Sequence, residues 1–167
     1  MRIVGHILGV IALSFFVMSI QQKEKKKLLN YQLISNVLYG VQYCFLNIYS
    51  AEIMNLISIF RCILFNRYEN EKKYLYFSFS ILLFTILISA LFIVKSPLDI
   101  IPILITLLYT ISTLQKNMNI VRYVFIGCAF LWLFYNFKVG ALAAFIGNII
   151  EISNSVISII RSKKNNI

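Results

Sequence analysis

Seven long apolar segments, separated by short polar and mostly basic connectors, make up nearly the whole chain. A helix needs about 20 mostly apolar residues to cross the hydrocarbon core of a membrane, with a range of roughly 17–25. The segments that fit are Ile3–Ile20, Leu28–Ile48, Tyr49–Phe65, Tyr74–Val94, Leu98–Leu114, Ile120–Asn136 and Val139–Ile160. The pattern predicts an all-α membrane protein with seven transmembrane helices and leaves no room for a soluble domain.

The composition favours a membrane protein over several other classes. Of the 167 residues, 60% are apolar and 13% are charged, whereas charged residues make up roughly 25% of soluble proteins. A soluble domain of this size has too little interior to hide that much apolar surface. The composition therefore excludes an ordinary soluble enzyme, a disordered segment and a secreted disulfide scaffold.

Residue types that carry chemistry are scarce. The three cysteines, Cys44, Cys62 and Cys128, lie in apolar segments without a CxxC spacing, and His6 is the single histidine. Scattered cysteines and one histidine do not make a metal cluster, and the sequence has no Gly-rich phosphate loop. We therefore expect no catalytic residues, no metal and no cofactor, and we do not expect an enzyme.

The basic residues indicate how the helices are oriented. The net charge is +10, which in a soluble protein would suggest nucleic acid as a partner. With the N-terminus outside, 13 of the 16 basic residues fall on the inner side, and only Arg2, Lys95 and Lys138 fall outside. Because basic loops stay in the cytoplasm, we expect a multi-pass protein with a cytoplasmic C-terminus, surrounded by lipid and without nucleic acid. Arg61 lies near the end of its segment, where its side chain is expected to reach the interface.

The first three and the last three segments share short sequence matches in the same order. Ser19–Lys23 matches Ser112–Lys116, Phe45–Ile48 matches Phe134–Phe137, and Ile57–Arg61 matches Ile157–Arg161. One unmatched helix between two triplets gives both triplets the same orientation, so the sequence predicts a 3+1+3 parallel repeat. The predicted parts are a first three-helix bundle (1–66), a linker loop with the fourth helix (67–95), and a second bundle with a short basic cytoplasmic tail (96–167).

Polar residues recur at helical spacing on two of the matched segments. Steps of three residues place Asn55 and Ser58 on one face of the third segment, and Asn148 and Glu151 on one face of the seventh. Polar groups in membrane helices face protein or water, and they also join helices at about 0.6 kcal/mol per hydrogen bond. For Asn55 and Asn148, substrate contact and a structural role are both open. Asn55 lies six residues before Arg61, whereas Asn148 lies thirteen before Arg161.

Glu151 is the one acidic residue near the centre of a segment. A charged carboxylate at the middle of the bilayer costs about 2.5–3.5 kcal/mol or more. The position predicts a proton-carrying or cation-binding role, with a protonated structural Glu bonded to Asn148 as the alternative. Tyr43 and Trp132 match between the triplets and are candidates to stack on a sugar ring or a flat heterocycle, with simple packing as the alternative.

Short motifs occur along nearly the whole chain, at Gly9–Ala12, Gly40–Gln42, Phe45–Leu46, Pro97, Pro102, Trp132, Asn136–Phe137 and Ile159–Arg161. With these motifs the chain resembles the YgjV-type bacterial inner-membrane proteins, relatives of the SWEET and PQ-loop transporter group. The resemblance implies a SWEET-like fold in the inner membrane, with a pathway for a sugar or metabolite between two three-helix bundles. In SWEET-like proteins an Asn on helix 3 and one on helix 7 flank the substrate, which implies this role for Asn55 and Asn148.

These expectations favour a small-solute transporter that works by alternating access between its two bundles. Its predicted substrate-binding residues are Tyr43, Asn55, Ser58, Trp132 and Asn148, and Glu151 would bind a proton or cation. The alternative is a non-transporting membrane scaffold or assembly protein whose polar stripes contact partners. A homo-oligomer is also open.

Overall fold

The computed structural model describes residues 2–164, except for the side chains of residues 2, 143, 158, 159 and 161–164. Every regular element in this range is helical, which confirms the all-α prediction. The elements are α1 (Arg2–Ile20), α2 (Lys25–Leu46), α3 (Tyr49–Arg67), α4 (Lys72–Ile93), the 3-10 helix η1 (Pro97–Asp99), α5 (Ile100–Ser112), α6 (Met118–Val139) and α7 (Leu142–Lys164). The end of the predicted cytoplasmic tail, 165–167, lies outside the described residues.

Three of the described helices are long and apolar enough to cross a membrane on their own, namely α1 over Ile3–Ile20, α4 and α6. The helices α2 and α3 have the length, but several buried polar residues make them less apolar. The predicted segment Leu98–Leu114 is shortened at both ends, because residues 97–99 form η1 and α5 ends at Ser112. With 13 residues, α5 spans about 20 Å, less than the roughly 30 Å of a hydrocarbon core.

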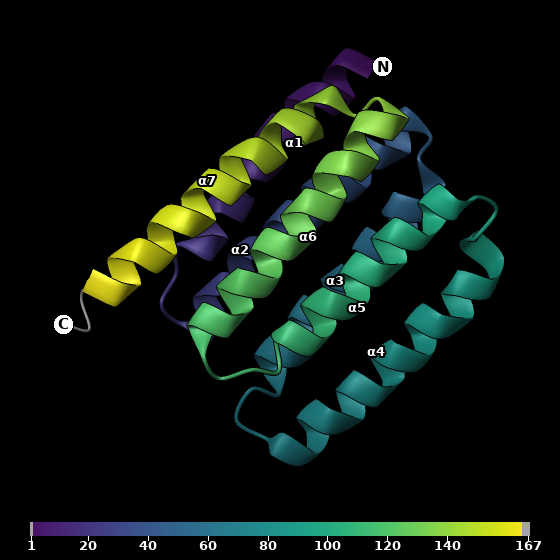
Figure 1. The fold of residues 1–167 in the computed structure, drawn as a ribbon. Coiled ribbons are helices and arrows are strands. Elements are labelled where there is room, and N and C mark those ends of the chain that lie inside the picture. The colour runs from purple at the N-terminus through teal and green to yellow at the C-terminus, as the bar shows by residue number, and fades with distance from the viewer. Residues whose placement is uncertain (1, 165–167) are drawn as a thin grey trace.

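Six helices form a closed ring, and the seventh lies outside it (Figure 1). Around the ring, α1 packs on α2, α2 on α3, α3 on α5, α5 on α6, α6 on α7, and α7 on α1. The helix α4 packs at the edge, against α3 and α5. It buries only Leu75, Ser78, Leu82 and Ile86, so it contributes little to the interior.

The helices α2 and α6 end in the same way. Asn47 and Gly140 follow their last residues and adopt left-handed conformations, with φ of 58° and 73°. The N–H of the next residue bonds to the carbonyl of Tyr43 in α2 and of Asn136 in α6, at 3.0 Å in both cases. This Schellman arrangement satisfies carbonyls that the helix end would leave free. Each turn leads into the next helix two residues later, so α2–α3 and α6–α7 are tight hairpins.

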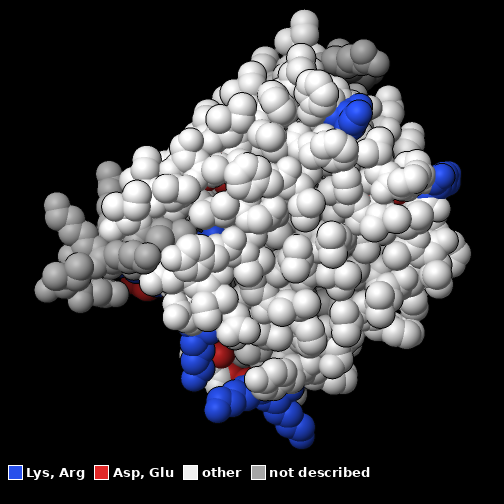
Figure 2. Space-filling view, in the orientation of Figure 1, with Lys and Arg blue, Asp and Glu red and all other residues white. Residues whose placement is uncertain are grey.

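The surface between the two ends of the helix ring is apolar. Large side chains such as Phe60, Phe84 and Leu91 point outward, and Figure 2 shows a broad face with few charged atoms. Lys and Arg gather mainly at one end of the molecule. There Lys23 and Lys116 lie in the α1–α2 and α5–α6 loops, Arg67 ends α3, and Lys72 and Lys73 begin α4. An uncharged belt of this kind suits contact with lipid tails.

The expectation that Arg61 reaches the interface is wrong. Its side chain is only 1% exposed, because α3 continues to Arg67 and leaves Arg61 well inside the helix. The guanidinium lies over the Tyr109 ring, 5.5 Å from the centroid, and Nη2 donates to Gln32 Oε1 at 3.3 Å. Its Nε and Nη1 atoms have no hydrogen-bond partner among the described residues. Arg61 is therefore a buried cation.

Candidate functional site

A buried cavity lies inside the ring of six helices. The space open to the centres of water molecules is about 40 Å³, room for about three waters. All six ring helices contribute to the wall, and α4 does not. The lining residues are Phe16, Asn36, Tyr39, Tyr43, Met54, Asn55, Ser58, Thr106, Tyr109, Trp132, Asn136, Asn148 and Glu151.

The structure brings all six site residues predicted from the sequence to this one cavity. They come from four helices and comprise Tyr43, Asn55, Ser58, Trp132, Asn148 and Glu151. Five of them are at most 6% exposed, and Trp132 is half-buried. Spacing along one helix does not explain why these residues lie close together. They meet because α2 and α3 face α6 and α7 across the cavity.

A chain of hydrogen bonds crosses the cavity wall and ends at Glu151. Tyr43 Oη donates to Asn136 Oδ1 at 2.8 Å, and Asn136 Nδ2 donates to Asn148 Oδ1 at 2.9 Å. Asn148 Nδ2 then donates to Glu151 Oε2 at 3.1 Å. Every donor points toward the carboxyl group, which is the acceptor at the end of the chain. The other oxygen, Glu151 Oε1, is buried without a partner among the described residues.

Aromatic side chains cover much of the wall. Tyr43 lies between Tyr39 and Trp132, with ring centroids 6.3 Å and 6.0 Å away and interplanar angles of 28° and 16°. Trp132 meets Tyr135 edge-on at 5.5 Å. Centroid spacings of about 4.5–7 Å are typical of attractive aromatic pairs. The four rings therefore form a continuous row of contacts that links α2 to α6.

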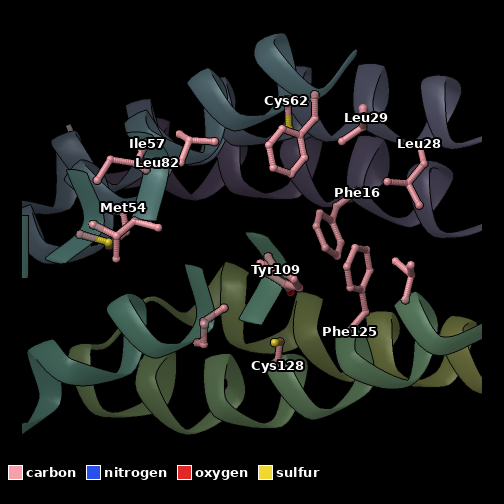
Figure 3. Packing of buried hydrophobic residues seen from close by; sticks show 14 of the residues in the cluster. Phe16, Leu28, Leu29, Met54, Ile57, Cys62, Leu82, Tyr109, Phe125 and Cys128 are labelled. Atoms are coloured by element: carbon pink, nitrogen blue, oxygen red, sulfur yellow. The ribbon is translucent and has the colours of Figure 1, made fainter. Parts of the chain in front are cut away.

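Three aromatic rings separate the cavity from the basic end of the molecule. Phe16 of α1 and Phe125 of α6 stack with centroids 6.1 Å apart, and Tyr109 of α5 meets Phe125 edge-on at 4.8 Å. Figure 3 shows Phe16 and Phe125 approaching each other from opposite layers, with Tyr109 beside them. Arg61 lies against Tyr109. The rings thus make an apolar barrier backed by a buried cation.

At the opposite end a polar contact joins α3 to α6. The Ser50 and Tyr135 hydroxyls lie 2.9 Å apart and share a hydrogen bond. Beyond them is a groove of about 450 Å³ between the α2–α3 turn, the α4–η1 loop and the end of α6. Tyr135 lines this groove and packs against Trp132 of the cavity. The Ser50–Tyr135 contact therefore lies between the two spaces.

Ten of the thirteen lining residues form pairs that are 93 positions apart. The pairs are Phe16 and Tyr109, Tyr39 and Trp132, Tyr43 and Asn136, Asn55 and Asn148, and Ser58 and Glu151. The left-handed residues Asn47 and Gly140 have the same spacing. Counted from these turns, Asn55 and Asn148 occupy the same place, eight residues further on. The sequence match that pairs Arg61 with Arg161 has a different residue spacing. With that spacing Asn55 and Asn148 do not correspond, so the match did not reveal that they form a pair.

Sequence reasoning did not assign Phe16, Tyr109 or Asn136 to the site. Phe16 and Tyr109 are apolar or amphipathic residues in apolar segments, so their type alone gives no signal. The match of Ser19–Lys23 to Ser112–Lys116 already contained the spacing of 93. Applied to the whole chain, a spacing of 93 residues pairs Phe16 with Tyr109 and Asn136 with Tyr43. Each of the three residues is then matched to a residue on the other side of the cavity.

The chemistry available in the cavity follows from the residues that line it. Glu151 is the one acid in the lining, which contains no Lys, Arg, His or Cys. Within residues 2–164, no three His, Cys, Asp or Glu side chains that the structure describes could hold a metal ion together. The lining offers hydrogen-bonding groups, aromatic faces and one carboxyl group.

Comparison with known proteins agrees with the apolar belt and the membrane-length helices. A family model described as a bacterial inner membrane protein, Imp-YgjV, matches residues 3–166. No curated protein and no solved structure matches the chain. The family match covers nearly all of the helix ring and α4. The chain therefore belongs to the Imp-YgjV family of bacterial inner membrane proteins.

Proposed function

We propose that the chain is a seven-pass carrier that moves a small solute through the central cavity by alternating access. The supporting observation is the set of five residue pairs, 93 positions apart, that line the cavity from α1–α3 and from α5–α7. Many secondary transporters consist of two structural repeats with the substrate site between them, near the middle of the membrane. A cavity built from matching positions fits that arrangement.

The packing of the helices supports a 3+1+3, SWEET-like plan. In a repeat of this kind, α1 corresponds to α5 and α3 corresponds to α7. The packing of α1 on α7 then corresponds to the packing of α5 on α3, and the structure contains both. The helix α4 has no counterpart and lies at the edge. In this proposal 1–66 and 96–167 are the two bundles and 67–95 connects them. The end of the molecule at which most Lys and Arg gather faces the cytoplasm, which leaves the N-terminus outside.

The contacts at the two ends of the cavity would open in turn. Separation of the Ser50 and Tyr135 hydroxyls would connect the cavity to the outer groove, and separation of Phe16 from Phe125 would connect it to the cytoplasm. Tyr43, Asn55, Ser58, Trp132 and Asn148 would contact the solute. Glu151 would bind a proton or a cationic group.

Flux measurements in proteoliposomes test the proposal directly. Purified protein is reconstituted, and the uptake of sugars, amines and other small metabolites is compared with that of empty vesicles. We expect uptake of at least one solute and its loss in Asn55→Ala and Asn148→Ala. Absence of flux for every solute, together with a partner that copurifies stably, would support the membrane scaffold instead.

Labelling from both sides of the membrane tests alternating access without knowledge of the solute. Ser58→Cys is introduced into a variant that lacks Cys44, Cys62 and Cys128, and a membrane-impermeant thiol reagent is added to one side at a time. We expect reaction from both sides. Ser78→Cys is the matched control, because Ser78 is buried on α4 and does not line the cavity. Reaction of Ser58→Cys from one side only would contradict alternating access.

A further inference from the structure

We propose that the cavity recognises its solute through a protonated amine, held by Glu151 and by neighbouring amide oxygens. This inference rests on the proposed carrier function and names the substrate class. An ammonium group has up to three N–H donors and no acceptor, so its best site presents several acceptors and a negative charge.

The amide groups at the cavity leave acceptors free. Asn55 Nδ2 donates to the Ala51 carbonyl at 2.9 Å, and Asn36 Nδ2 donates to Cys62 Sγ at 3.6 Å. Each side chain therefore donates one of its two N–H groups to protein, and its oxygen accepts no hydrogen bond among the described residues. Glu151 Oε1 is likewise buried and unpaired there. Three oxygen atoms at one cavity remain for donors of a ligand.

The lysines and arginines whose side chains the structure describes lie outside the cavity surface. No Lys, Arg or His lines the space, and the nearby Arg61 faces the Tyr109 ring and Gln32. Asn148 directs its N–H to Glu151 Oε2. An anionic group in the cavity would meet the Glu151 carboxyl group with no cationic side chain in the lining to balance it, whereas a cationic group would meet complementary atoms.

The aromatic faces add to this preference. Cations are attracted to Trp and Tyr rings within about 6 Å of the ring centroid, and Tyr39, Tyr43, Tyr109 and Trp132 all line the space. The room for about three waters restricts the head group to a small one.

The position of Glu151 within the matched pairs points the same way. Ser58 occupies the corresponding place, 93 residues earlier, so this pair gives the cavity a carboxyl group on one wall and a hydroxyl group on the other. The remaining pairs are aromatic or uncharged polar residues. A solute with one cationic end fits this asymmetry better than an uncharged solute.

The single tryptophan of the chain, Trp132, permits a binding test in which the signal comes from the cavity itself. Tryptophan fluorescence of the reconstituted protein is titrated with ethanolamine at neutral pH and, as a matched neutral molecule, with ethylene glycol. We expect ethanolamine to bind at least about tenfold more tightly, the ratio for one charge-assisted hydrogen bond. We expect Glu151→Gln to remove this difference and Glu52→Gln, a half-buried acid outside the cavity, to retain it.

The outcomes separate the substrate class from the carrier proposal. Glycine adds a carboxylate to the ammonium group, so binding of glycine as tight as that of ethanolamine would assign an amino acid, and weaker binding a simple amine. Equal binding of ethylene glycol and ethanolamine by the unmodified protein would overturn the inference. This comparison does not depend on the folding of any variant. Binding and flux of neutral solutes alone would overturn it and leave the carrier proposal standing. Absence of binding and of flux for every solute would overturn both.

Discussion

Tyr43 on α2 and Asn136 on α6 share a 2.8 Å hydrogen bond across the cavity, and they occupy matching positions 93 residues apart. Hydrogen bonds link Tyr43 through Asn136 and Asn148 to Glu151, and this first bond is the one that connects α1–α3 to α5–α7. The later steps lie between α6 and α7 and within α7. The Tyr43 hydroxyl thus couples α2 to the carboxyl group on the opposite side of the cavity.

Tyr43→Phe removes this coupling and keeps the ring. We expect a loss of about 1–3 kcal/mol in stability, because the buried Asn136 oxygen loses its donor. Thermal unfolding in detergent measures the effect. Tyr31→Phe is the control, since the Tyr31 ring packs on Phe15 outside the cavity. Equal unfolding temperatures for both variants would show that the hydroxyl is not needed.

Asn55 and Asn148 have matching positions and different partners. Asn148 bonds to both Asn136 and Glu151, whereas Asn55 bonds only to the Ala51 carbonyl of its own helix. We therefore expect Asn148→Ala to lower the unfolding temperature more than Asn55→Ala, since it leaves two buried groups without partners. The same proteins would be assayed for flux, which we expect both substitutions to abolish. Equal destabilisation by the two would contradict the structural difference between them.

The close approach of α1 to α2 depends on Gly9. A Cβ atom at this position would overlap the side-chain amide of Gln42, which is fully buried. We expect Gly9→Ala to be destabilising, since the packed amide must move. Gly127→Ala on α6 is the control, because its Cβ would meet nothing within 4 Å, and we expect a neutral or slightly stabilising effect. The unfolding temperatures of the two variants are compared with that of the unmodified protein. A Gly9→Ala protein as stable as the unmodified one would contradict the close approach of Gly9 to Gln42.

Arg61 is a buried cation with only part of its hydrogen-bonding capacity used. Replacing a buried ion pair by apolar residues of similar size is often neutral or stabilising, by about 1–4 kcal/mol. Arg61 has no acidic partner among the described residues to offset the cost of its burial. We expect Arg61→Met to unfold at the same or a higher temperature than the unmodified chain. Arg67→Met, at the exposed end of α3, controls for the loss of one positive charge. A marked drop in stability for Arg61→Met alone would mean that this guanidinium holds α2, α3 and α5 together.

The sequence predicted those parts of the fold and of the cavity in which the residue type or its spacing differs from that of the surrounding apolar segment. The apolar segments predicted all the helices, because a chain in lipid must satisfy its backbone within each helix. Helix ends were less accurate: Pro97–Asp99 form a separate 3-10 helix, and Arg61 is buried because α3 runs past the predicted end at Phe65. Polar residues at helical spacing predicted the wall of α3 and α7. Phe16 and Tyr109 were missed, since an aromatic residue in an apolar segment looks the same whether it faces lipid, core or cavity.

Asp99, the single aspartate of the chain, predicts a pH dependence outside the membrane-spanning helices. Its Oδ2 accepts hydrogen bonds from the backbone N–H groups of Lys95 and Ser96 at 3.2 Å and 2.8 Å, and from Ser96 Oγ at 2.9 Å. Burial raises the pKa of Asp99, but hydrogen bonds from Ser50, Ser96 and the backbone outweigh burial, and the pKa lies below its ordinary value.

Because the pKa of Asp99 is lower in the folded protein than in the unfolded chain, its ionised form stabilises the η1 turn. That stabilisation is complete above the ordinary Asp pKa of about 3.9 and is lost as the pH falls through the lower value of the folded state. Selective ¹³C labelling of aspartate reports this one carboxyl group, so its titration in detergent can be followed directly. We expect a midpoint below that of a free peptide, and a shift to a higher midpoint in Ser96→Ala, which removes one donor. A midpoint at the ordinary value in both proteins would contradict the hydrogen bonding of the loop.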